Sequence, residues 1–258
     1  QASLVGQGAV QPGLAKITFG TGGMLDVCLG PDRPLEASRS DGGTFPIVCW
    51  QRDGEQMWGL EAIMLSCGTN VQWLRDDLGI IDDTAQSDEL AASVDDADGV
   101  VFVPAPLGLG TPHWDYGARS GLFGLTRGST KAHVARAVLE GVAQRGAELL
   151  AAAEADSGAS IDALRVDGGM SQNRTFIQAL ANAIQRPVEV SPVLEATARG
   201  GGLAAGVALG WFESVPALAD LWQPAEVIEP NGAFSADRWA EAVRRVGGWH
   251  PELSAINF

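Results

Sequence analysis

Long hydrophobic runs and paired cysteines are both absent from this chain of 258 residues. No stretch approaches the roughly eighteen apolar residues of a membrane-spanning helix, so no span is expected. The first residue is Gln1, with neither a basic start nor a long apolar core after it, and we expect no signal peptide. Cys28, Cys49 and Cys67 are an odd set without CxxC spacing, which predicts reduced, packed thiols in a cytoplasmic protein.

Positive charge is also scarce. Lys and Arg number 17 against 32 Asp and Glu, a formal net charge of −15 at pH 7. This balance argues against a nucleic-acid partner and against an anionic membrane surface. It does not exclude ATP, because a few backbone N–H groups and a Mg²⁺ ion can outweigh a distant field. His113, His133 and His250 lie far apart without metal-ligand spacing, and we expect them to be surface or packing residues.

Several enzyme motifs are missing. There is no GxSxG elbow of an α/β-hydrolase. The Walker A pattern fails because Gly124 to Gly128 is followed by Ser129 and not by Lys. Neither Gly20-Thr21-Gly22 nor Gly108-Leu109-Gly110 has the third spaced glycine of the dinucleotide fingerprint.

Apolar residues and glycine are plentiful. The hydrophobic fraction is 46% and there are 33 glycines, which fits a compact α/β protein with many tight turns. A chain of this length can bury about 70–75% of its unfolded surface, as one large domain or two intimate ones. The missing initiator Met indicates a piece of a longer protein, although a trimmed or processed terminus would look the same.

Hydrophobic periodicity predicts a succession of strands and helices. The expected strands are Ala15–Phe19, Met24–Leu29, Thr44–Cys49, Met57–Gly59, Gly99–Val103, Leu122–Leu125 and Val188–Val190. The expected helices are Glu61–Leu78, Lys131–Ala155, Glu195–Leu209 and Asp237–Val246. An acidic stretch from Asp76 to Asp88 is most simply a solvated face.

The most informative segment is LRVDGGMSQN, residues 164–173. An apolar run ends in Asp167, and Gly168 and Gly169 can take backbone angles closed to other residues. Ser171 or Asn173 can then cap a helix. Such a helix N-terminus offers free N–H groups and a partial positive charge, where anionic or nucleotide ligands commonly sit. A plain strand-to-helix turn is the alternative.

Other glycines have two readings each. At the tip of the first predicted hairpin, Gly20-Thr21-Gly22 could hold phosphate oxygens or serve only as a turn. Gly68 lies one helical turn before Gln72, so the missing side chain could admit a ligand beside an amide, or only a neighbouring helix. Gly200, Gly201 and Gly202 would each cost a helix about 1 kcal/mol relative to Ala, which indicates that another backbone or a ligand packs closely there.

Four long segments occur in an order that resembles a known family. They are AKITFGTGGML, WGLEAIMLSCGTNVQWLRDDLGII, VFVPAPLGLGTPHWDYGARSGLFGLTRGSTKAHVARAVLEGVA and LRVDGGMSQN. Together they resemble the C-terminal half of the FGGY carbohydrate kinases, most closely the glycerol kinases. Within the third segment, Ser120 to Glu140 resembles the second signature of that family throughout. The resemblance runs from Gln1 to about Trp249.

This resemblance implies an α/β fold, namely an actin-like ATPase lobe of ribonuclease H-like type with a mixed sheet and flanking helices. Residues 1–258 would be the C-terminal nucleotide-binding lobe, and ATP would lie in the cleft between it and an N-terminal lobe that the chain lacks. The nucleotide-binding residues implied are Thr21, Gly22, Gly68, Gln72, Gly168, Gly169 and Asn173, with Thr21 facing the phosphates and the Gly169–Asn173 pair on the adenosine side.

The implied reaction is phosphoryl transfer from ATP to a small polyol or sugar, first of all glycerol, assisted by Mg²⁺. An aspartate deprotonates the acceptor hydroxyl, Mg²⁺ bridges the ATP phosphates, and backbone donors stabilise charge on the γ-phosphoryl group. That aspartate opens a run resembling Asp-Gln-Gln-Ala, of which Gln1-Ala2 matches the end. We therefore expect no catalytic residue and no metal ligand within the chain.

Met24 departs from the family pattern, because glycerol kinases usually carry an aromatic residue there, near the substrate. The acceptor could thus be another sugar. A non-catalytic actin-like nucleotide-binding or interaction module is a further alternative. The partners expected are ATP, the polyol or sugar and the N-terminal lobe, without nucleic acid or membrane; a homo-oligomer of the whole protein is compatible with the resemblance.

Overall fold

A computed structural model describes residues 1–34 and 38–256 of the chain. Its centre is a sheet in the spatial order β3-β4-β2-β1-β7-β8-β9. These strands are β1 (Ala15–Phe19), β2 (Gly23–Gly30), β3 (Phe45–Arg52), β4 (Glu55–Met64), β7 (Leu164–Asp167), β8 (Val188–Val190) and β9 (Glu226–Ile228). β7 pairs in parallel with β1 and β8, whereas the other pairs are antiparallel, so the expected mixed sheet is confirmed.

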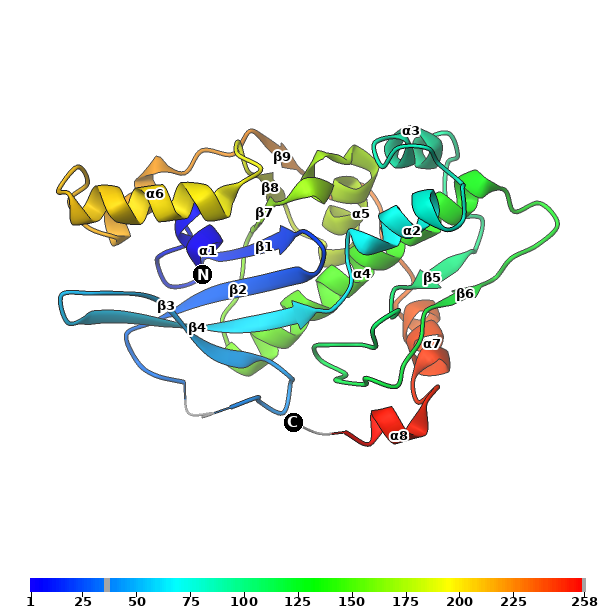
Figure 1. Cartoon of the computed structure of the whole chain (residues 1–258), viewed down its shortest axis with the longest axis horizontal. Coiled ribbons are helices and arrows are strands. Elements are labelled where there is room, and N and C mark those ends of the chain that lie inside the picture. Colours follow the sequence, from blue (N-terminus) through cyan, green and yellow to red (C-terminus); the bar gives the residue numbers. More distant parts are fainter. Residues whose placement is uncertain (35–37, 257–258) are drawn as a thin grey trace.

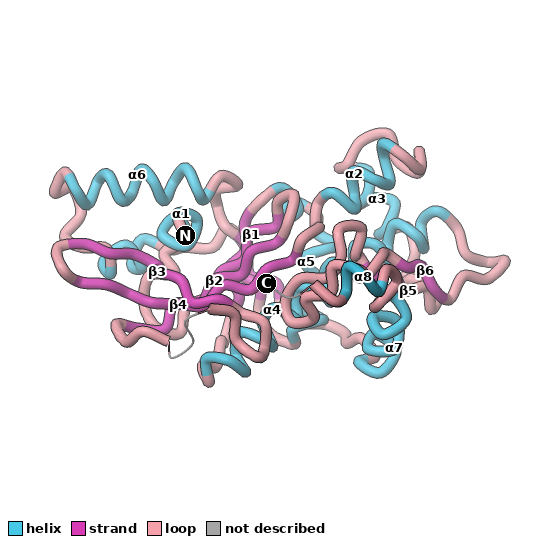
Figure 2. Tube along the Cα trace, turned by 60° about the horizontal axis from the view of Figure 1, so that its bottom comes forward, coloured by secondary structure: helices cyan, strands magenta, loops and turns pink. Residues whose placement is uncertain are grey.

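Helices cover both faces of this sheet (Figures 1 and 2). The longest, α4 (Lys131–Ser157), lies against one face with α5 (Arg174–Ile184), and α1 (Ala2–Gly6) lies on the other face with α6 (Ala196–Ala208). The remaining elements are α2 (Thr69–Asp76), α3 (Gln86–Ala92), β5 (Val101–Val103), β6 (Gly121–Phe123), η1 (Gly169–Gln172), η2 (Pro216–Leu221), α7 (Ala236–Val246) and α8 (Pro251–Ser254).

The main hydrophobic core lies between the sheet and α4 and α5. Alternate residues of β1 and β2 point into it, among them Ile17, Phe19 and Leu25, which are fully buried. Phe19 meets Phe176 of α5 edge to face, with ring centroids 4.8 Å apart. Within the described part of the chain, no helix is both long and apolar enough to cross a membrane.

The long helix was predicted closely. Val138 and Val142 are fully buried on one face of α4. Gly158 follows the helix with a φ of 68°, the left-handed conformation in which glycine ends helices at no steric cost. The thiols of Cys28, Cys49 and Cys67 are buried and free, as expected.

The predicted helix Glu61–Leu78 is wrong over its first part. Residues up to Met64 belong to β4, and the helix α2 begins only at Thr69. β4 pairs with β2 on one side and with β3 on the other, so its backbone hydrogen bonds are used on both edges. Leu60, Ala62 and Met64 are buried at alternate positions, a period of two that the overlapping helical spacing obscured.

Gly200 owes its place in α6 to the neighbouring helix α1. A Cβ at Gly200 would fall far inside van der Waals contact with the carbonyl group of Ala2, and one at Gly6 would do the same with Ala196. The backbones of α1 and α6 can therefore pack this closely only because Gly6 and Gly200 have no side chains. A Cβ at Gly201 or Gly202 would meet nothing, so the fold of this chain does not require either glycine.

We predict opposite effects for two alanine substitutions in α6. Gly200→Ala should lower the free energy of unfolding by about 1–3 kcal/mol, because the added methyl group overpacks the α1 contact. Gly201→Ala, one residue away, should raise it by about 0.5–1 kcal/mol, because alanine favours the helix and meets open space. Urea denaturation of both variants provides the test, and equal shifts would contradict the packing argument.

Candidate functional site

The parallel pairing of β1 with β7 brings two glycine turns together. Thr18 lies opposite Asp167 in this pair, so both strands end at the same edge of the sheet. The chain leaves β1 through Gly20-Thr21-Gly22 and leaves β7 through Gly168-Gly169. Figure 1 shows the β1–β2 hairpin pointing toward α2 and α5 at this edge.

The hairpin tip is held against the start of α2. The amide of Cys67 donates to Thr21 O at 2.8 Å, and the amide of Gly68 donates to Gly20 O at 2.9 Å. A Cβ at Gly68 would lie 2.7 Å from Gly20 O, so glycine is needed for this close approach. Gly68 is thus a packing residue at the N-cap of α2, whatever else it contacts.

The two glycines after Asp167 differ. Gly168 has a φ of 89°, a conformation that favours glycine, and a Cβ there would collide with the backbone of Phe19. Gly169 has no positive φ, and apart from its two chain neighbours a Cβ there would meet no described residue within 4 Å. The prediction of special backbone angles therefore holds for Gly168 and is wrong for Gly169.

A cavity of about 460 Å³ opens between these elements. Its wall includes Thr21, Gly68, Gln72, Gly169 and Asn173, which the structure thus brings together from three separate segments. It also includes Phe19, Gly20, Val71, Thr84, Ala85, Ser87, Asp88, Glu89, Met170 and Gln172. A pocket of this size is typical of a small-molecule site.

Gly22, Gly168 and Met24 lie outside this wall. Gly22 is confined by packing, since a Cβ there would lie 2.8 Å from Met64 O. Met24 is 39% exposed on β2 and pairs with Thr18, so it points to the α1 side of the sheet. Close backbone neighbours already account for glycine at positions 22 and 168, without a nucleotide contact.

The N-terminus of α5 does not offer free N–H groups to an anion, contrary to the sequence-based expectation. The carboxylate of Asp88 accepts hydrogen bonds from Arg174 N at 3.2 Å and Thr175 N at 2.9 Å. It also accepts one from the Thr175 hydroxyl at 2.6 Å. Because α3 supplies this carboxylate, a fixed negative charge of the protein occupies the positive end of the helix.

Asn173 completes the cap. Its side-chain oxygen accepts a hydrogen bond from Phe176 N at 2.8 Å, which makes Asn173, and not Ser171, the N-cap residue of α5. The Ser171 hydroxyl donates instead to Gly168 O at 2.7 Å and closes the glycine turn. The side-chain nitrogen of Asn173 donates to Ser87 at 3.0 Å.

Asp167 is a buried carboxylate behind the glycine turn, with 1% of its surface exposed. It accepts hydrogen bonds from Gln7 Nε2 at 2.8 Å and from the Thr18 hydroxyl at 2.6 Å. Burial raises the pKa of Asp167 above its ordinary value, and the Thr18 hydrogen bond and the nearby Lys16 oppose that shift. Asp167 therefore ties α1, β1 and β7 together.

A row of charged residues crosses the α1 side of the sheet beside Met24. Lys16 Nζ lies 2.8 Å from Asp26 Oδ2, and both side chains are buried. Lys16 also donates to Met24 O at 3.2 Å. Glu61 faces Asp26 across β2 and β4, and burial together with the Asp26 charge raises the pKa of Glu61.

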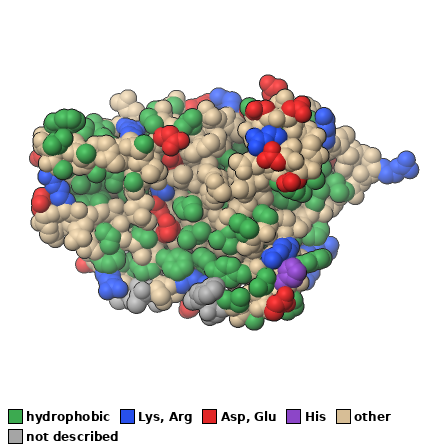
Figure 3. Space-filling view, in the orientation of Figure 1, with side chains coloured by type: hydrophobic (Ala, Val, Ile, Leu, Met, Phe, Trp, Pro, Cys, Tyr) green, Lys and Arg blue, Asp and Glu red, His purple; other side chains and the backbone are tan. Residues whose placement is uncertain are grey.

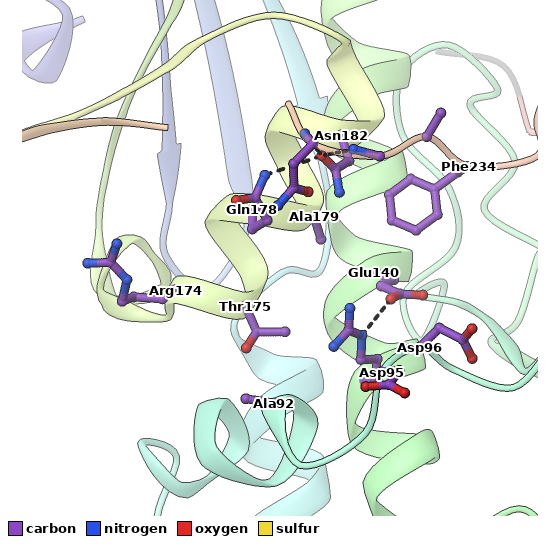
Figure 4. A pocket seen from close by; sticks show the side chains of 14 residues that line it. Ala92, Asp95, Asp96, Glu140, Arg174, Thr175, Gln178, Ala179, Asn182 and Phe234 are labelled. Atoms are coloured by element: carbon purple, nitrogen blue, oxygen red, sulfur yellow. Dashed lines mark hydrogen bonds and ion pairs between the residues drawn. The ribbon is translucent and has the colours of Figure 1, made fainter. Parts of the chain in front are cut away.

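A second cavity, of about 580 Å³, lies between α3, α4, α5 and residues 231–234 (Figure 4). It contains none of the residues expected to bind a ligand. Some of its polar groups pair with one another: Arg136 donates to Glu140 at 2.8 Å, and Asn182 Oδ1 accepts from the amides of Asn231 and Gly232. Among the described residues, no buried side-chain atom without a partner lines it.

Sequence reasoning missed Ser87, Asp88 and Glu89 of α3 as part of the site wall. The acidic stretch was expected to be a solvated face, which is wrong for Asp88. No local pattern distinguishes Asp88 from the other acidic residues near it, because its partners lie 86 and 87 residues further along the chain.

Comparison with known proteins gives a consistent result. The family model described as "FGGY family of carbohydrate kinases, C-terminal domain" matches residues 15–209. The glycerol kinase of Rhodopirellula baltica is 42% identical over 254 residues, which are 96% of this chain and 46% of that protein. The glycerol kinase of Deinococcus radiodurans is 41% identical over 260 residues, 99% of this chain and 51% of that protein.

Solved structures agree. The glycerol kinase of Plasmodium falciparum, crystallised with ADP, matches with a TM-score of 0.83 and 27% identity, over 100% of this chain and 50% of that one. A xylulose kinase from Brucella ovis matches with a TM-score of 0.80 and 26% identity, over 99% of this chain and 52% of that one. These likenesses confirm the expected actin-like fold. The chain spans about half the length of the relatives it matches.

We predict that Asp88→Ala destabilises the protein by about 1–2 kcal/mol, because it removes the hydrogen bonds that Asp88 accepts from Arg174 N, Thr175 N and the Thr175 hydroxyl between α3 and α5. The control is Asp77→Ala, which alters an exposed residue of the same acidic stretch and should change stability by less than about 0.5 kcal/mol. Thermal or urea unfolding measures both. Equal stabilities would show that the Asp88 cap contributes nothing.

Proposed function

The chain belongs to the FGGY family of carbohydrate kinases, and from this membership we propose that it is the nucleotide-binding half of an ATP-dependent polyol kinase whose acceptor is glycerol. The whole enzyme would convert ATP and glycerol to ADP and glycerol 3-phosphate in the cytoplasm. The observation that supports this most directly is the cavity shared by Thr21, Gly68, Gln72, Gly169 and Asn173.

The two ends of this cavity suit different parts of a nucleotide. At one end the Thr21 hydroxyl is exposed at the hairpin tip, where a phosphate oxygen could accept its hydrogen bond. At the other end Gly169 leaves open space beside Asn173. The N-terminus of α5 is already neutralised by Asp88, so the triphosphate is expected at the hairpin and the nucleoside against Gly169.

We assign no residue of this chain to a magnesium ion, only to the nucleotide. Among those described, no group of three or more His, Cys, Asp or Glu side chains could hold a metal ion. Asp167, the carboxylate nearest the glycine turn, is engaged by Gln7 and Thr18. We propose that the carboxylates which position Mg²⁺ on the ATP phosphates come from the N-terminal lobe.

The N-terminal lobe is the partner that we propose for the α1 side of the sheet. Figure 3 shows hydrophobic side chains gathered on this side, over the region of β2, β3 and β4. Met24 is 39% exposed there. A lobe docked on this side would cover apolar surface and would bring the acceptor near Met24.

Glycerol is favoured as acceptor by the names of two relatives, each at about 40% identity over nearly the whole chain. Met24 leaves another sugar as the second candidate acceptor, because glycerol kinases usually have an aromatic residue at this position. A screen of polyols and pentuloses with the protein that carries both lobes decides this. Turnover of another sugar but not of glycerol would overturn the proposed acceptor, and no turnover with any would favour a binding module.

We predict that this chain alone binds ATP weakly and phosphorylates nothing. This chain would supply about half of the contacts to ATP, and water would reach every phosphate oxygen in the open cavity, so the Kd for Mg-ATP should be near the millimolar range, about −4 kcal/mol. Titration calorimetry and a glycerol phosphorylation assay test the two parts. Micromolar binding would favour a complete nucleotide-binding module, and glycerol phosphorylation above background would contradict the need for a second lobe.

We predict that Gly169→Val in the two-lobed protein raises KM for ATP by at least tenfold, with KM for glycerol little changed. A side chain there fills space that we assign to the nucleoside, whereas apart from its two chain neighbours no described residue lies within 4 Å of the added Cβ. Circular dichroism should therefore show a folded variant. A folded Gly169→Val enzyme with normal ATP kinetics would remove this glycine from the site.

A further inference from the structure

The side-chain amide of Asn173 is held in one orientation by bonds at both ends. Its oxygen accepts from Phe176 N at 2.8 Å, and a backbone amide can only donate. The nitrogen must therefore face Ser87 Oγ, at 3.0 Å. Ser87 in turn uses its own hydrogen to donate to Thr84 O at 2.6 Å, so it can only accept from Asn173.

These hydrogen bonds leave one N–H donor of Asn173 unused. The Asn173 nitrogen carries two hydrogens, and Ser87 takes one. No described residue accepts the second, and Asn173 lines the cavity. The protein thus offers the cavity an N–H donor at this point and keeps the carbonyl oxygen of the same amide turned to the helix.

Ser87 is itself firmly placed. It is 1% exposed and lies in the first turn of α3. The adjacent Asp88 fastens α3 to the first turn of α5, and Arg136 of α4 donates to the carbonyl groups of Ala91 and Val94 at 3.3 and 3.0 Å. Both ends of α3 are therefore anchored, so Ser87 is a fixed acceptor.

We propose that Ser87 is a positioning residue of the nucleotide site, which makes Asn173 present an N–H donor, and not its carbonyl oxygen, to the nucleoside part of the ligand. This inference rests on the proposed function. The matching ligand chemistry is a hydrogen-bond acceptor, such as a ribose oxygen or a purine ring nitrogen. Ser87 does not touch the reacting phosphate, so its effect should appear in nucleotide affinity alone.

The test compares Ser87→Ala with Ser93→Ala in the two-lobed protein. Ser93, at the other end of α3, makes the same kind of hydroxyl bond, to Leu90 O at 2.6 Å, but is exposed and has no bond to Asn173. Ser87→Ala should raise KM for ATP by about three- to tenfold, the loss of one oriented hydrogen bond. The value of kcat and KM for the acceptor should stay as in the parent, and Ser93→Ala should match the parent throughout.

Inhibition by adenosine, which has no phosphate, sharpens the assignment. Its inhibition constant should rise in Ser87→Ala by the same factor as KM for ATP. Ser87→Thr retains the hydroxyl, so its KM for ATP and its inhibition constant for adenosine should equal those of the parent. An unchanged KM for ATP in folded Ser87→Ala, or equal effects of the two alanine variants, would overturn the proposal.

Asn173→Asp provides a second route if Ser87→Ala fails to fold. It preserves the cap on Phe176 N but replaces the donor by a carboxylate oxygen, so KM for ATP should rise at least as much as expected for Ser87→Ala. Normal ATP kinetics in this variant would overturn the proposal as well. A parent protein that neither binds nor uses ATP would instead refute the proposed function, which keeps the two failures distinct.

Discussion

The parallel pairing of β1 and β7 is the constraint on which the site depends. Parallel strands end at the same edge of a sheet, so the register Thr18 to Asp167 places two glycine turns side by side although nearly 150 residues separate them. Asp167 reinforces this register from beneath, through Thr18 on β1 and Gln7 beyond α1. A shift of β7 by one residue would turn this carboxylate to the α4 side and would separate the turns.

Glycines around the cavity do two kinds of work. Gly22, Gly68 and Gly168 are small because another backbone lies where their side chains would be. Gly169 has no such neighbour in the protein, and its lack of a side chain enlarges the cavity instead. Positions of the first kind are a condition of folding, whereas Gly169 can be varied without a clash. A substitution at Gly169 therefore tests ligand binding separately from folding.

Electrostatics divide the cavity. The first turn of α5 would attract an anion, but Asp88 already satisfies two of its amides and Asn173 a third. The partial positive charge at the start of α5 thereby interacts with a carboxylate of α3 and helps to hold α3 against α5. The same carboxylate disfavours a polyanionic triphosphate at that end, which supports the proposal of a nucleoside near Asn173 and phosphates near Thr21.

The sequence by itself determined the strands β1 and β2, the length of α4 and the glycine turn after β7, because each depends on local periodicity, turn residues or helix ends. It also indicated the family, through four segments in order. Only the tertiary structure decided that Glu61–Met64 is a strand, since pairing on both edges outweighs helical spacing. It alone decided that Asp88 caps α5 and that Ser87 orients Asn173, because hydrogen bonds between residues more than 80 positions apart leave no periodic trace in the chain.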